Sequence, residues 1–188
     1  MRSKNSVMIV LLVAMWAGSS AASVEIDGVR FSRDIEVKST RMALQGYGLL
    51  RYMVFIKAYV GALYVQEATG QQDVLKPVAK RLELEYFHAI KGEDFAEATR
   101  RKIADNTSVE EAALLLPRID RMAALYRDVE PGDRYALTYL PGEGTELALN
   151  GEPLGVIPGE DFQRAVFAIW LGDSPIDRDF RKALLGVL

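Results

Sequence analysis

DFQRAVFAIWLGDSPIDRDFRKALLG, residues 161–186, is the stretch of sequence that decides the fold. Its first half places apolar residues at helical spacing and predicts a helix with one face in a core: Phe162, Ala165, Val166, Ile169 and Trp170. Gly172 predicts the end of this helix. Ser174 is expected to cap a second helix, with Pro175 at its first position and Asp177 three residues after the cap.

The stretches before this helix pair are mostly β-strand. Alternating apolar and polar residues predict strands at 24–31 around an Asp27-Gly28 turn, at 40–45, at 81–87, and in a three-stranded meander over 133–157. The segment 52–65, YMVFIKAYVGALYV, is rich in β-branched and aromatic residues and is expected near the centre of a sheet. Gly46 and Gly48 predict a bend or bulge.

Two further helices are predicted between residues 91 and 126. Asp94 is expected to cap the first, and Ser108 opens the second with a capping box. Pro117 is expected to kink the second helix. The following residues are expected on its buried face: Val109, Ala112, Ala113, Leu116, Ile119, Ala123 and Tyr126. The order of elements predicts an α+β domain, with one large antiparallel sheet and helices packed on one face.

Composition excludes several classes of function. The chain has 188 residues, a net charge of −3 and no cysteine, which argues against nucleic-acid binding, thiol redox chemistry and cysteine metal sites. His88 is the only histidine and is expected to be structural or exposed, so a Ser-His-Asp triad is disfavoured. Glu83 and Glu85 share one face of a strand and are expected to be solvated. No metal and no cofactor is expected.

The N-terminus has the pattern of a secretory signal peptide. Arg2 and Lys4 precede an apolar run at 7–17, and small residues follow, with Ser20 and Ala22 at −3 and −1 of a cleavage site. We therefore expect a cleaved signal peptide at residues 1–22 and a single domain at 23–188, without stable membrane insertion after cleavage. The alternative is an uncleaved anchor. Export from a bacterium would place the domain in the periplasm.

One strand carries cations and phenols among apolar neighbours. Lys57 and Tyr59 share a face by alternation, and Arg51 joins them if no bulge intervenes. Such a group could hold a carboxylate or stabilise a developing enolate. The alternative is that Arg51 and Lys57 extend to solvent while Tyr59 and Tyr64 pack in the core.

Three motifs in order resemble the bacterial chalcone isomerase-like family. The first comprises Gly46, Gly48, Arg51, Lys57, Tyr59, Val60, Leu63 and Tyr64. The second comprises Asp133, Tyr135 and Leu137, then the segments 139–145 (YLPGEGT) and 149–151 (LNG). The third is the FxxAxFxIWLGxxP signature within 161–186. The chain departs from the family pattern at Gln45, where asparagine is usual, and at Met53, where lysine is usual.

The resemblance implies an open-faced β-sandwich with an apolar cleft between sheet and helices. Plant enzymes of the family close chalcones to flavanones, and an arginine there stabilises the enolate. Other members bind fatty acids and use that arginine with a tyrosine to hold the carboxylate. The bacterial branch looks like a lineage without demonstrated isomerase chemistry as its general rule.

The family's site residues carry over only in part. Arg51 is the best match to the arginine, and Arg41 is a weaker competitor. Tyr59 falls where the enzymes place a threonine and is similar to the fatty-acid-binding branch. Phe95 falls where the enzymes carry a catalytic tyrosine, and it has no hydroxyl. These departures argue against chalcone cyclisation.

Three hypotheses follow. The first is an exported protein that binds a small amphipathic, fatty-acid-like ligand through Arg51, Tyr59, Lys57 and Phe95, without catalysis. The second is an isomerase, an intramolecular lyase, acting on a conjugated unsaturated substrate with Arg51 as its catalytic residue. The third is an envelope protein that binds a protein partner of unknown identity. An exposed Arg51 away from any cleft would contradict the first two hypotheses and favour the third.

Overall fold

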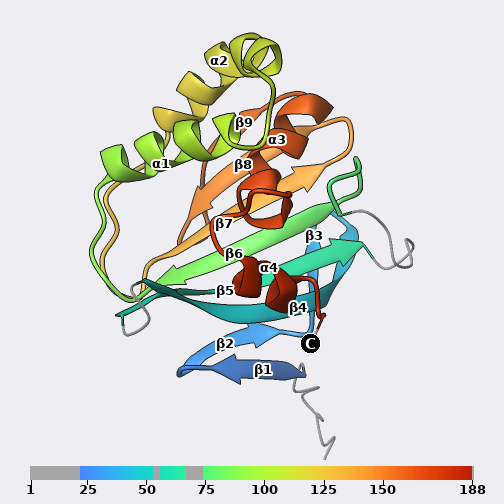
Figure 1. Ribbon diagram of the computed structural model, residues 1–188. Helices are drawn as coiled ribbons and strands as arrows, with labels where there is room; N and C mark the ends of the chain where they lie inside the picture. Colours follow the sequence, from blue (N-terminus) through green and yellow to red (C-terminus); the bar gives the residue numbers. More distant parts are fainter. Residues whose placement is uncertain (1–21, 53–55, 67–73, 188) are drawn as a thin grey trace, which may run out of the picture.

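The computed structural model describes residues 22–52, 56–66 and 74–187. Its main sheet is antiparallel, and its seven strands lie side by side in sequence order: β3 (Asp34–Val37), β4 (Thr40–Tyr52), β5 (Ile56–Gln66), β6 (Lys80–Tyr86), β7 (Arg134–Leu140), β8 (Gly144–Leu149) and β9 (Glu152–Ile157). The helices are α1 (Gly92–Ala104), α2 (Val109–Ala123), α3 (Glu160–Leu171) and α4 (Arg178–Leu184). The helices lie to one side of the sheet (Figure 1), so the predicted α+β class is confirmed.

A second, two-stranded sheet covers part of the other face. It consists of β1 (Ser23–Ile26) and β2 (Val29–Ser32). Side chains alternate across each strand of the main sheet. Leu63 of β5 accordingly belongs to the apolar cluster under the helices, whereas Val60 and Tyr64 belong to a second cluster with Phe31 of the hairpin. The centre of the main sheet is therefore buried on both faces.

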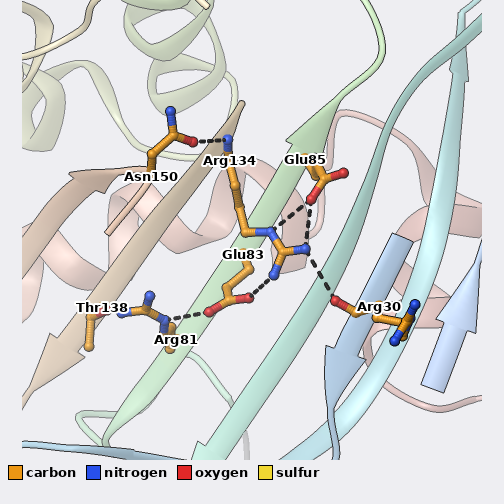
Figure 2. A network of polar contacts seen from close by, with 7 residues as sticks. All are labelled: Arg30, Arg81, Glu83, Glu85, Arg134, Thr138 and Asn150. Atoms are coloured by element: carbon orange, nitrogen blue, oxygen red, sulfur yellow. Dashed lines mark hydrogen bonds and ion pairs between the residues drawn. The ribbon is translucent and has the colours of Figure 1, made fainter. Parts of the chain in front are cut away.

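An ion network joins the hairpin side of the sheet to β1–β2. The Arg134 guanidinium donates to Glu83 at 3.0 Å, to Glu85 at 2.7 Å and to the Arg30 carbonyl at 3.2 Å (Figure 2). Arg81 donates to the other oxygen of Glu83 at 2.8 Å. Glu83 is only 9% exposed. The expectation that this face is solvated was wrong, because the hairpin covers it.

Helix α4 lies directly on two glycines of β4. A Cβ atom built on Gly46 would stand 2.2 Å from the Ala183 carbonyl oxygen, and one on Gly48 would stand 2.7 Å from the Ala183 Cβ. A register shift between Leu44 and Gly46 confirms the predicted bulge. The glycines therefore also provide room for the C-terminal helix.

The helix ends agree with the sequence in two cases and differ in two. Gly172 is the C-cap of α3, as predicted. Ser108 caps α2 by accepting from the Glu111 N–H, as predicted. Asp177, and not Ser174, caps α4 by accepting from the Phe180 N–H at 2.7 Å, and Pro175 lies outside the helix. Lys91 is the N-cap of α1 without a side-chain hydrogen bond, and Asp94 lies in the first turn.

The buried face of α2 also differs from the expected one. Leu115 is fully buried, whereas Val109 and Leu116 are exposed. Ile119 and Ala123 are buried as expected. Pro117 lies inside the helix.

The predicted signal peptide lies outside the described residues except for Ala22, and it stays a prediction. No helix within the described ranges is long and apolar enough to cross a membrane. The same residues contain no group of three or more histidine, cysteine, aspartate or glutamate side chains arranged to hold a metal ion.

We predict that Gly48→Ala destabilises the fold by about 1–3 kcal/mol, because the added methyl group overpacks the contact with Ala183. The double variant with Ala183→Gly should lose less stability than the sum of the two single variants. Urea denaturation of the four proteins measures this coupling. Additive losses would contradict the close contact between α4 and β4.

We predict that Arg134→Met costs about 1–3 kcal/mol, because Glu85 loses its cation and the buried Glu83 keeps only Arg81. The matched control is Lys91→Met, which breaks a pair with Asp128 whose side chains are 68% and 58% exposed. That control should leave the free energy of unfolding nearly unchanged, because solvent screens the exposed pair. Chemical denaturation compares the two, and equal losses would show that the network is no more buried than a surface pair.

Candidate functional site

A cavity of about 260 Å³ lies between the main sheet and the helices. Its floor comes from β5, β6, β7 and β8, and its roof comes from α1, α3 and the segments after α2 and before α4. Most of the lining side chains are aliphatic or aromatic. The fold therefore encloses an apolar space at the place where the sequence predicted a cleft.

Strand alternation builds the floor of the cavity. Leu82, Leu84 and Tyr86 occupy every second position of β6, and all three line the cavity. The residues between them point into the ion network. Across the ladder, Leu82 pairs with Leu137 and Leu84 pairs with Tyr135, and both partners also line the cavity. The period of two in the sequence thus separates the apolar floor from the charged face.

Helical spacing builds the roof. Phe95, Ala98, Thr99 and Lys102 of α1 recur three or four residues apart and all line the cavity. Trp170 of α3 closes another side. The Trp170 indole N–H donates to the Tyr59 hydroxyl at 3.1 Å, which joins α3 to β5 across the space.

An aromatic cluster fills one end of the cavity. The Phe95 ring lies 5.2 Å from that of Tyr86, 5.3 Å from that of Tyr135 and 5.5 Å from that of Tyr126, measured between ring centroids. Edge-on contacts dominate, as expected for rings with negative faces and positive edges. The cluster fixes the ring positions at this end.

The phenols of the cavity are kept neutral. Burial raises the pKa of Tyr59 and Tyr86 well above the ordinary value, and it raises the pKa of Tyr126 to about 12. Tyr126 shares a 2.9 Å hydrogen bond with Thr99, and Tyr135 donates to the Arg127 carbonyl. These side chains can donate hydrogen bonds at neutral pH but cannot act as phenolate bases.

Charge is sparse around the cavity. Asp94 and Lys102 are its charged lining residues, and the Lys102 ammonium lies 3.0 Å from the Asp105 carboxylate. No arginine from the described ranges lines the space. The site therefore offers apolar contact and a few hydroxyl groups, with its one lysine already paired.

The structure brings together two of the four predicted ligand-binding residues. Tyr59 and Phe95 both line the cavity. Arg51 and Lys57 do not: Arg51 is exposed opposite Lys57, and Lys57 forms an ion pair with Asp27 of the hairpin turn. A bulge intervenes, because Leu50 pairs with Tyr59 and Arg51 with Lys57, which leaves Ala58 without a partner on β4.

Arg41, the weaker candidate for the family arginine, also does not line the cavity. It is exposed on β4 and pairs in the ladder with Glu36 of β3. The binding roles of Arg51, Lys57, Tyr59 and Phe95 stay predictions.

Several lining residues were missed from the sequence. Tyr86 continues the alternation of Leu82 and Leu84, so its face could have been assigned. Trp170 was assigned to a core stripe, but its indole N–H contact with Tyr59 joins positions 111 residues apart and has no local signal. Tyr126 and Tyr135 reach the cavity through tertiary packing alone.

Comparison with known proteins agrees with the fold. The family model described as "Chalcone isomerase-like" matches residues 23–186. The crystal structure of the Arabidopsis thaliana fatty-acid binding protein AtFAP1 superposes with a TM-score of 0.68 at 15% sequence identity, covering 87% of this chain and 96% of that one. No curated protein sequence matches significantly. Because the family model spans nearly the whole described domain, the chain belongs to the chalcone isomerase-like family.

Proposed function

We propose that this protein is an exported binding protein that takes a small amphipathic, fatty-acid-like ligand into its apolar cavity and catalyses no reaction on it. The observation that carries the proposal is the cavity itself, about 260 Å³ lined mainly by aliphatic and aromatic side chains. This volume lies just below the range of about 300–1,000 Å³ for drug-sized ligands, so a short or medium acyl chain is the expected size.

The solved structure of AtFAP1 supports the same class of ligand. That protein is described as a fatty-acid binding protein, and this chain shares its fold. Apolar surface buried on binding would supply most of the affinity here, because the cavity wall has few polar groups.

The geometry gives less support to the isomerase hypothesis. An isomerase of this type needs a cation beside the developing enolate, and Arg51 does not line the cavity. Phe95 does line it, but it has no hydroxyl to hold a water molecule. The exposed Arg51 also removes the expected ionic clamp for a carboxylate, so apolar contact has to carry ligand binding.

The exposed Arg51 was the observation expected to contradict both ligand binding and isomerase activity through this arginine and to favour a partner-binding protein. The presence of the cavity beneath α1 and α3 supports ligand binding in spite of it. Export rests on the signal-peptide pattern of residues 1–22, and we place the domain in the periplasm as part of the proposal.

We predict that the protein isolated from the periplasm of its own cells begins at Ser23 and carries one acyl ligand per chain. Native mass spectrometry measures both the processed mass and the bound mass, and solvent extraction identifies the ligand. A chain with an intact N-terminus in the membrane fraction would contradict export. An apo mass that does not shift on adding fatty acids would contradict ligand binding.

We predict that Ala98→Trp blocks the cavity and weakens fatty-acid binding at least tenfold, because Ala98 is part of its roof. Glu97→Trp is the matched control, since Glu97 is the exposed neighbour on α1. In the wild type, affinity should rise about fourfold for each added methylene until the cavity is full. Calorimetric titration with acids of increasing length measures both effects. Equal binding by the two variants would place the ligand elsewhere.

A further inference from the structure

One hydroxyl group of the cavity wall lacks a partner. Tyr86 is only 4% exposed. Within the described ranges its hydroxyl forms no hydrogen bond, whereas those of Tyr59, Tyr126 and Tyr135 each form at least one. The oxygen is not among the fully buried unpaired atoms of the described residues, so a molecule in the cavity can supply its hydrogen-bond partner.

The Tyr86 ring is surrounded by other aromatic rings, and its hydroxyl forms no hydrogen bond with them. The ring contacts the rings of Tyr59, Phe95 and Tyr135 at centroid distances of 5.4, 5.2 and 6.1 Å. Of these neighbours, the Tyr135 hydroxyl already bonds the Arg127 backbone, and Phe95 has no polar atom. Tyr86 lines the cavity, so a molecule in the cavity can reach it.

The charges around the cavity decide which kind of oxygen fits. Asp94 repels an anion, and the positive charge of Lys102 is already engaged by Asp105. Lys102 also lies in the last turn of α1, where the helix dipole is negative. A carboxylate placed deep in this space would lose its hydration without gaining a free cation. A neutral oxygen avoids that cost.

We infer that the Tyr86 hydroxyl donates a hydrogen bond to a neutral acceptor oxygen of the ligand, such as that of a ketone, an ester or an alcohol. This inference rests on the proposed function and specifies the ligand class of the same cavity. Tyr59 is placed to assist, because its hydroxyl accepts from Trp170 and its own hydrogen forms no bond within the described residues. A fatty acid satisfies Tyr86 only when protonated or when its chain carries a second oxygen.

The separation along α1 indicates where that second oxygen would lie. Phe95, which touches Tyr86, and Lys102 are seven residues apart, which corresponds to about 10 Å of helix. A carbon–carbon bond is about 1.5 Å long, and in an extended zigzag chain each carbon adds somewhat less than one bond length to the end-to-end distance. On the order of eight carbons therefore cover this distance. A compound of about eight carbons with an oxygen near Tyr86 fits both this length and the free hydroxyl group.

The test compares two ligands that differ in one atom group. The first is 2-decanone, and the second is 2-methyl-1-decene, in which a methylene group replaces the carbonyl oxygen. Both are measured by displacement of the neutral fluorophore N-phenyl-1-naphthylamine from the full-length chain. Tyr86→Phe should lower the affinity for 2-decanone by about three- to tenfold and change the affinity for the alkene by less than about twofold. Tyr126→Phe is the control, because that hydroxyl already has Thr99 as its partner, and it should leave the preference between the two ligands unchanged.

Equal losses for the ketone and the alkene in Tyr86→Phe would overturn the inference and leave the proposed function intact. Failure of both ligands to bind the wild type would overturn the proposed function as well. If Tyr86→Phe does not fold, the infrared carbonyl stretch of 2-decanone bound to the wild type gives the answer. A shift to lower wavenumber relative to heptane solution supports the hydrogen bond, and an unshifted band overturns it.

Discussion

The alternation of side chains along β6 is the constraint on which the rest of the structure depends. Every second residue of this strand, from Leu82 to Tyr86, faces the helices, and every residue between them faces the hairpin. Because one strand supplies both sets, a shift of one residue would place carboxylates in the cavity and leucines in the ion network. The cavity and the network are therefore two sides of a single register.

The two faces of the main sheet are stabilised by different interactions. On the hairpin side, Glu83 receives hydrogen bonds from both Arg81 and Arg134, which offset the cost of removing its charge from water. Arg134 also lies over the Phe31 ring at 4.6 Å, so it holds the hairpin by a cation–π contact as well. On the helix side, apolar burial dominates, and the hydrogen bond between Trp170 and Tyr59 fixes α3 above β5. The charged side gives the sheet a fixed register, and the apolar side uses that register to shape a binding space.

Much of the fold was predictable because its signals are local. The period-two pattern of β6, the hairpin turns and the Ser108 cap depend on neighbours in sequence, and the structure agrees with each of them. The misses have non-local causes. Leu115 rather than Leu116 is buried because three consecutive leucines leave the helical phase open. Glu83 is buried because β1–β2 folds over it.

The candidate site was less predictable than the fold. Placing Arg51 beside Tyr59 required an unbroken β4–β5 ladder, and the extra residue at Ala58 breaks it. Tyr59 and Phe95 reached the cavity as expected, but the contacts that give Tyr59 its partner and leave Tyr86 without one come from α3 and from the ring cluster. A sequence pattern assigns faces, whereas hydrogen-bond partners across the core depend on how helices settle on the sheet.

The contact between β2 and β7 has a consequence for the order of folding during synthesis. Arg134 bonds the Arg30 carbonyl across 104 residues of chain. At about 5–20 residues per second, a ribosome needs roughly 5–20 seconds to make that interval. An isolated two-stranded hairpin is at best marginally stable in water. The apolar contacts of the hairpin with β5 can therefore form early, whereas the ion network that fixes the hairpin forms only after β7 has been made.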